Sequence, residues 1–306
     1  MGKLPLCCAA LIFSHLLYAQ TDAELERINF FPKTDRYAVL DYQYQYYSID
    51  TPTNNTMVKG ERNLSHLYAL TFAQKFRKKY FLGLNTFWET VREKGLHYGL
   101  PSRESNVSRG IREPEVFLRW RLRPQTEEIG LFDLVLNYAH SMGPRKIGDH
   151  ESNRLNGQSK YEIALHHGKY EGEWEYRTSM RFIYFNEGLI ENTVNDKTYD
   201  LLPNRHFIFN FQVQNQVMNN MFINGSIGFR YRGTQVIEGR DDVELDIQSG
   251  TGSIFRLGMK TYFTNQLLGD LSYSYSKNDY FVKGSPSNLE GQEKTQSLTF
   301  GLIYGF

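Results

Sequence analysis

The chain is 306 residues long, with 35 basic and 34 acidic residues, and 15% of its residues are aromatic. This balanced charge gives no support to nucleic-acid binding, which is usually marked by a basic excess or patch. The mean hydropathy of −0.52 is typical of a soluble protein. A transmembrane β-barrel gives the same value, because only every second residue of each strand faces lipid. The composition therefore argues against a bundle of membrane helices but not against a membrane barrel.

The beginning of the chain predicts a secretory signal peptide over residues 1–19. Lys3 precedes an apolar run that ends at Leu17, and the small Ala19 favours cleavage directly after it. The run is too short to span a bilayer, which requires ~20 apolar residues. Both cysteines lie inside it, so the processed protein would have no disulfide. Residues 20–35 would then form a periplasmic N-terminal segment.

Twelve segments with alternating apolar and polar residues follow along the chain. This period of two is typical of a β-strand with one face toward an apolar phase. A single segment of this kind is weak evidence, whereas twelve in succession favour a barrel. The segments begin near Tyr37, Leu64, Tyr80, Val116, Phe132, Tyr161, Trp174, Phe207, Ile223, Phe255, Leu267 and Leu298.

The connections between these segments alternate in length. Short turns are expected near residues 77–79, 124–130, 171–172, 215–220 and 264–266. Long polar connections are expected near residues 51–62, 93–113, 143–159, 187–204, 233–252 and 281–294. The first predicted strand begins and the last predicted strand ends on the short-turn side. This arrangement is typical of an outer-membrane barrel with an even number of strands. The predicted fold class is all-β: a transmembrane antiparallel β-barrel of about 12 strands over residues 36–306, with short periplasmic turns and long extracellular loops.

The final segment, from Leu298 to Phe306, is the most regular of the twelve. The spacing of Thr299, Gly301, Tyr304 and Phe306 resembles the C-terminal signal by which bacterial outer-membrane barrels are recognised for insertion. The resemblance implies that Gly301, Tyr304 and Phe306 act as an assembly signal. It also implies a location in the outer membrane of a Gram-negative bacterium, with outer-membrane lipid and the barrel-assembly machinery as partners.

Charged residues gather on the strand face that points away from lipid, and the fourth and the seventh to tenth segments are richer there in arginine than in acids. The functional interpretation is a charged constriction, because rings of charged side chains filter ions and solutes in pores. The alternative is that these side chains pair across strands and fill the interior, since about 12 strands falls between a plugged and an open barrel. The predicted lumen-lining residues are Arg119, Arg121, Arg177, Arg181, Arg230, Arg256, Lys260, Glu115, Asp133, Glu162 and Glu175.

The stretch from Gly110 to Leu122, with the sequence GIREPEVFLRWRL, resembles the Gly-x-x-Asp-Pro strand opening of outer-membrane transporters of the phenol-degradation (MetA-pathway) type. Glu113 stands in the place of the Asp. The similarity extends to about residue 186 through Gly143-Pro144 and the Gly172-Glu173-Trp174 turn. It implies transport of small, often hydrophobic compounds without naming the solute.

Two other functions compete with a channel. His150-Glu151-Ser152-Asn153 matches the His-x-Ser-Asn core of outer-membrane phospholipases, in which His activates Ser as a nucleophile. This match lies in a polar connection, away from any apolar strand face. The other alternative is a structural or adhesive barrel without a pore. The sequence contains no Walker or dinucleotide fingerprint. We therefore expect a channel or transporter for small molecules of hydrophobic or anionic character, with no enzymatic activity, cofactor, metal or nucleic-acid partner.

Overall fold

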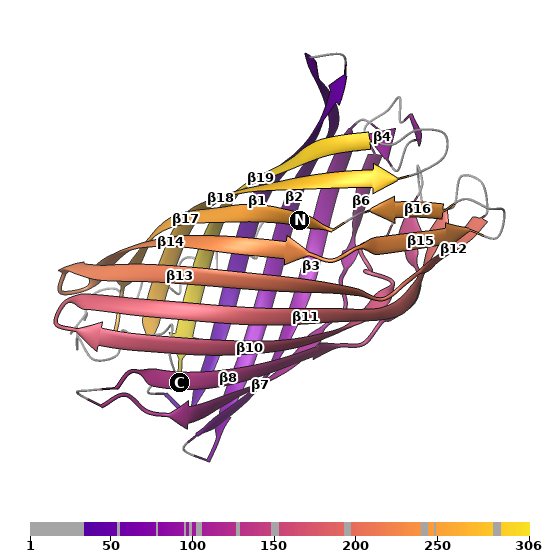
Figure 1. The fold of residues 1–306 in the computed structure, drawn as a ribbon. Helices are drawn as coiled ribbons and strands as arrows, with labels where there is room; N and C mark the ends of the chain where they lie inside the picture. The colour runs from indigo at the N-terminus through magenta and orange to yellow at the C-terminus, as the bar shows by residue number, and fades with distance from the viewer. Residues whose placement is uncertain are drawn as a thin grey trace, which may run out of the picture.

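The computed structural model describes residues 34–53, 56–77, 79–94, 96–97, 100–101, 106–126, 129–147, 153–192, 197–239, 244–247, 249–283 and 289–306. The regular secondary structure of these residues consists of β-strands, and the strands wind into a barrel (Figure 1). Within them, no helix combines the length and apolarity needed to cross a membrane. The predicted signal peptide, nearly all of residues 20–35, and both His150 and Ser152 lie outside the described residues.

Twelve antiparallel wall strands form the barrel, and some consist of two consecutive pieces. β1 (Arg36–Thr53) pairs with β2 (Thr56–Phe76) on one side and with β19 (Leu289–Gly305) on the other. The strands between them are β3 (Tyr80–Lys94), β6 (Asn106–Ile111) with β7 (Glu115–Arg123), β8 (Leu131–Ala139), β10 (Gln158–Glu171), β11 (Trp174–Asn192), β12 (Lys197–Leu201) with β13 (Asn204–Met218), β14 (Met221–Arg232) with β15 (Gln235–Gly239), β16 (Glu244–Ile247) with β17 (Gly250–Tyr262), and β18 (Leu267–Lys283).

Three short strands complete the described structure. β9 (Arg145–Ile147) pairs in parallel with the distal part of β11. β4 (Leu96–His97) and β5 (Leu100–Pro101) pair only with each other.

Closure of the barrel extends to Phe306. The backbone N–H of Arg36 donates to the carbonyl of Phe306 at 3.2 Å, and the N–H of Phe306 donates back at 2.9 Å. A closed sheet leaves no edge, so no row of backbone polar groups is exposed to lipid. The sequence-predicted fold class, a transmembrane antiparallel barrel, is confirmed.

The wall has an apolar outer face and a polar inner face, as the alternation predicts. Polar side chains alternate with the apolar ones along each strand and point to the other side. A continuous exposed apolar surface of this extent is unusual for a soluble protein and is normally covered by lipid. Exposed hydrophobic side chains include Leu40, Leu70, Leu82, Trp88, Val116, Leu136, Ile163, Phe182, Ile227, Phe255, Leu271, Leu298 and Phe300.

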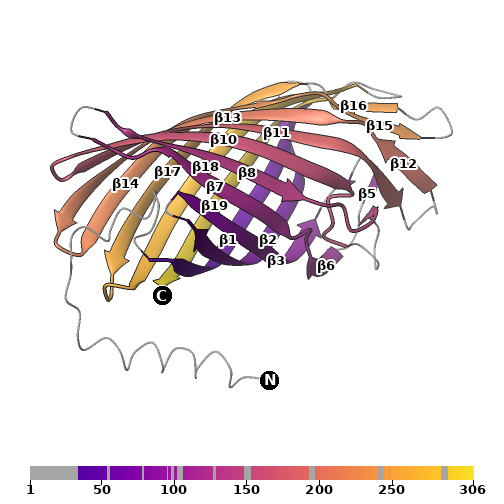
Figure 2. The same ribbon diagram turned by 90° about the horizontal axis from the view of Figure 1, so that it is seen from below.

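The long connections contain more strand than the sequence predicted. Residues 51–62 were expected to be a loop, yet β1 runs to Thr53 and β2 begins at Thr56. Inter-strand hydrogen bonds continue beyond the apolar band, where alternation of apolar and polar residues is no longer required. The extensions β12, β15 and β16 gather at the end of the barrel that lies away from the C-terminus (Figure 2).

Candidate lumen site

The structure places every predicted lumen-lining residue on the inner face, opposite the exposed apolar side chains. None of these residues is exposed, and Asp133, Glu162, Glu175 and Lys260 are buried. A charge that is buried in a protein is costly unless it is paired and hydrogen-bonded. The interaction partners of these charged side chains therefore decide whether the inner face carries only neutral ion pairs or a net charge of one sign.

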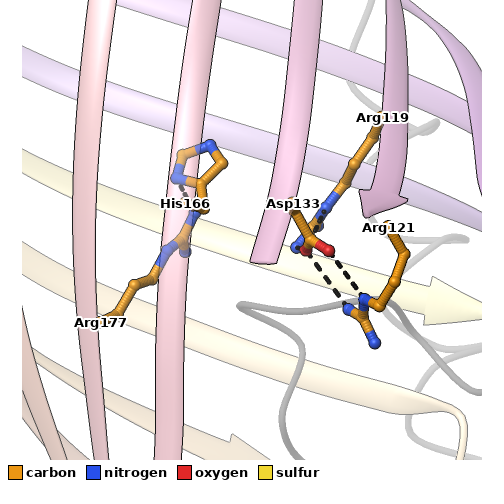
Figure 3. Close-up of polar contacts among 5 residues, drawn as sticks. All are labelled: Arg119, Arg121, Asp133, His166 and Arg177. Carbon is orange, nitrogen blue, oxygen red and sulfur yellow. Dashed lines mark hydrogen bonds and ion pairs between the residues drawn. The ribbon is translucent and has the colours of Figure 1, made fainter. Parts of the chain in front are cut away.

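Asp133 on β8 binds two arginines of β7 at once (Figure 3). Arg119 donates from Nη2 to Oδ2 at 2.8 Å, and Arg121 donates from Nε to Oδ1 at 2.7 Å. The carboxylate is fully buried. The two arginines come from adjacent inward positions of one strand, because side chains at i and i+2 share a face. One carboxylate thus binds two guanidinium groups, and these three side chains together carry one net positive charge.

Arg177 on β11 adds a third guanidinium beside this pair (Figure 3). Its Nη2 donates to Nδ1 of His166 at 3.1 Å, and His166 is paired in register with Asp133. Because Nδ1 accepts this hydrogen bond, the imidazole is neutral with its proton on Nε2. His166 therefore adds no positive charge while it positions Arg177. The Nε of Arg177 is buried and has no hydrogen-bond partner among the described residues.

A second network lies on β7, β10 and β11 and is more evenly balanced. Nε of Arg181 donates to Glu162 at 2.7 Å. Nζ of Lys160 pairs with Glu115 and lies 3.7 Å from a carboxylate oxygen of Glu162. Two bases and two acids are thus interleaved across three strands. Sequence analysis missed Lys160, which lies on the inner face one residue before the apolar alternation of its segment becomes regular.

The opposite wall carries a third group of charges. Arg256 on β17 lies 3.5 Å from Asp270 on β18, and Lys260 interacts electrostatically with Asp270 and Glu175. Glu175 also accepts a hydrogen bond from the side chain of Gln214 at 3.1 Å. Arg177 interacts electrostatically with the acids Glu175 and Asp133 and with two other arginines, Arg119 and Arg256. The arginine cluster of Figure 3 is therefore electrostatically connected to the opposite wall.

Arg230 on β14, the remaining predicted base, has charged neighbours but no ion pair within salt-bridge distance among the described residues. Its guanidinium interacts electrostatically with Arg232 and Glu293. Glu293 pairs instead with Arg232, whose Nη1 lies 3.1 Å from the carboxylate. Glu293 lies in a connection that the sequence predicted to be polar loop. In the structure β19 (Leu289–Gly305) is longer than the predicted strand and includes Glu293, which places this residue on the lumen face.

Inward-facing apolar clusters line the short-turn end of the barrel. In one of them, Phe81 and Phe117 are buried with Ala73, and the Tyr37 ring lies 5.6 Å from that of Phe81. Gly83 makes room for this cluster, because a Cβ at that position would collide with the ring of Phe117. The other cluster contains Phe222, Tyr262, Leu268 and Ile303. The core residues of both clusters are buried, so they fill the interior beside the charged residues.

The three residues of the predicted assembly signal have distinct surroundings. Tyr304 and Phe306 point outward, and their rings stack with centroids 5.8 Å apart. Gly301 points inward, where an added Cβ would lie 2.5 Å from a carboxylate oxygen of Asp41. The glycine therefore also has a packing role that is independent of assembly. Its role in recognition remains a prediction.

No protein-family model matches the sequence, and no curated protein matches it. An outer-membrane channel from Pseudomonas putida F1 has a similar structure, with a TM-score of 0.62 and 12% sequence identity over 90% of this chain and 97% of that chain. The translocator domain of the autotransporter NalP from Neisseria meningitidis gives a TM-score of 0.48 at 12% identity, over 99% and 97% of the respective chains. The first similarity supports the fold alone. The protein thus has the fold of an outer-membrane β-barrel.

Proposed function

We propose that this protein is an outer-membrane channel for small organic solutes that combine an apolar body with a negatively charged group. The observation that carries this proposal is the cluster of Arg119, Arg121 and Arg177, whose three guanidinium groups lie near the two carboxylates of Asp133 and Glu175. A pore wall with an excess of one sign concentrates ions of the opposite sign. The neighbouring balanced pairs limit this excess, so we expect modest anion selectivity.

The apolar part of the proposal has a separate basis in the sequence. The sequence resemblance to transporters of the phenol-degradation type supports the same solute class. The structural similarity to an outer-membrane channel of Pseudomonas putida F1 supports passage through the barrel. Outer-membrane location, assembly by the barrel machinery and the absence of enzymatic activity belong to this proposal.

Liposome swelling and planar-bilayer conductance of the refolded protein test the proposal. We expect measurable swelling with small carboxylates such as benzoate, and a reversal potential that indicates anion preference across a salt gradient. Absence of both signals would support a structural barrel instead. A hydrolase using His150 and Ser152 would release fatty acid from phospholipid vesicles, and this activity would disappear in Ser152→Ala.

A further inference from the structure

The chain leaves the barrel wall just before β10 and folds inward. Gly157 adopts a left-handed conformation with φ of +76°, which favours glycine. Its carbonyl accepts the N–H of Leu189 at 3.1 Å, and the next position of β11, Ile190, pairs with Arg145 of β9. β9 thus occupies the place beside β11 that an extension of β10 would take. Residues 153–157, which we call the inner strap, therefore have no place in the wall.

The inner strap lies against the inner face of β6. A Cβ added to Gly110 would be 3.9 Å from the backbone N and from Cγ of Arg154. Gly110 shares the inner face with the buried Ser108, whereas Val107 and Ile111 point outward and are exposed. The strap backbone therefore approaches the wall from inside the barrel. The absence of a side chain at Gly110 permits this close approach.

Two buried acids of the wall hold the strap in this place. The carboxylate of Glu113 accepts the backbone N–H groups of Asn156 at 2.7 Å and Gly157 at 3.3 Å. Glu89 on β3 accepts Nε of Arg154 at 2.9 Å. Hydrogen bonds to a charged group are among the stronger ones in proteins. The strap is therefore fixed at two points that are separated along the wall.

Further polar contacts connect the strap to its surroundings. Nη1 of Arg154 donates to the hydroxyl of Ser108 at 3.2 Å, and the hydroxyl of Ser65 donates to Glu89 at 3.0 Å. The side-chain amide of Asn153 accepts the N–H of Lys146 at 2.9 Å and donates to the carbonyl of Pro144 at 3.0 Å. These contacts link the strap to β2, β6 and the segment that contains β9. The strap is thus part of the internal packing of the barrel.

We propose that the inner strap narrows the extracellular half of the lumen and sets the upper size of the solutes that pass. This inference rests on the proposed channel function. The strap belongs to a connection on the long-loop side, which is extracellular in barrels of this class. Arg154 and Glu89 are accordingly determinants of size selectivity, and Glu113 positions the strap through its backbone.

The first test compares the single-channel conductance of Arg154→Gln with that of a matched control, Arg232→Gln. Each substitution removes one positive charge and one ion pair from the lumen, but Arg232 pairs with Glu293 between wall strands. We expect Arg154→Gln to raise conductance about twofold, because flow through a pore depends on its narrowest section. Larger neutral sugars should also enter liposomes that contain this variant. Equal conductance of the two variants would overturn the size-limiting role.

The second test examines the position of the strap independently of conduction. In a background with Cys7→Ser and Cys8→Ser, we expect Gly110→Cys and Arg154→Cys to form a disulfide on mild oxidation, because their Cβ atoms are expected near the roughly 4 Å that a disulfide requires. Absence of the disulfide would refute the placement. If the disulfide forms but no protein conducts, the channel function fails and the size-limiting role fails with it. Conductance without a difference between Arg154→Gln and Arg232→Gln refutes only the size limit.

Discussion

Replacing Asp133 by Asn tests the origin of the positive excess in the lumen. The substitution keeps the shape of the side chain but removes the one carboxylate that Arg119 and Arg121 share. Removing one partner of a buried ion pair costs about 3–5 kcal/mol. Because 13% and 19% of the two arginine side chains remain exposed, solvent can screen part of this cost. We therefore expect a loss of about 3 kcal/mol, the lower end of that range.

This loss predicts two measurable changes. The temperature at which the unboiled protein loses its folded mobility on a gel should fall by ~6 °C, at roughly 2 °C per kcal/mol for a domain of this size. The reversal potential should shift toward stronger anion preference, because the substitution removes one negative charge from beside the guanidinium groups of Arg119 and Arg121. The double substitution Asp133→Asn, Arg121→Gln restores the local charge and should reverse the second change. An unchanged or weaker anion preference in Asp133→Asn would refute the proposed role of the cluster.

Other substitutions examine the remaining parts of the barrel. Arg177→Ala combined with Arg181→Ala should weaken anion preference by removing two inward bases, which reversal potentials would detect; unchanged preference would show that these charges only fill the interior. Gly301→Ala should lower the gel-transition temperature by ~2 °C or more, since the new Cβ meets a carboxylate, while Gly225→Ala, with its nearest atom 3.6 Å away, should be tolerated better. Phe306→Asp should reduce the amount of folded barrel in outer-membrane fractions, and normal assembly would contradict the terminal-signal prediction.

The outer face of the barrel was predictable from sequence because lipid imposes one uniform requirement on it. Each outward position needs an apolar side chain, so the pattern from Leu298 to Phe306 identifies a strand without knowledge of its neighbours. Above the apolar band this requirement ends, which is why the beginning of β2 at Thr56 was missed. Strand pairing there depends on the register with β1 and leaves no periodic signal in either segment.

The inner face was predictable only as a set of residues. Alternation placed Asp133 inside, but its contacts with Arg119 and Arg121 depend on the register between β7 and β8. His166 could have been found from its parity, because it lies on the same face as Glu162. Its hydrogen-bond partner Arg177 could be assigned only from the structure. The structure also shows that the neighbouring His167 lies next to the outward Phe132 ring.

Glu113 illustrates the limit of motif comparison. In the sequence it is a departure from the Asp expected before Pro114, with no chemical role attached. In the structure its carboxylate binds two backbone N–H groups located 43 and 44 residues further along the chain. No local pattern contains this contact, because it depends on where the inner strap leaves the wall at Gly157. A longer Glu side chain at this position is therefore compatible with a structural role for the motif.

The sequence of features along the lumen gives the proposed channel a physical order of selection. A solute from outside would first meet the inner strap, where the rigid contacts of Arg154 select by size. It would next reach the arginines around Asp133, which favour a negatively charged group and lie nearer the short-turn end, where Arg119 is opposite Phe81. Partial pairing is essential to this arrangement, since an unpaired cluster would hold an anion too tightly for release, whereas complete pairing would remove the attraction. Arg119 and Arg121 are paired to an intermediate degree, because they share the one carboxylate of Asp133. Their positions are fixed, and the three side chains together keep one net positive charge.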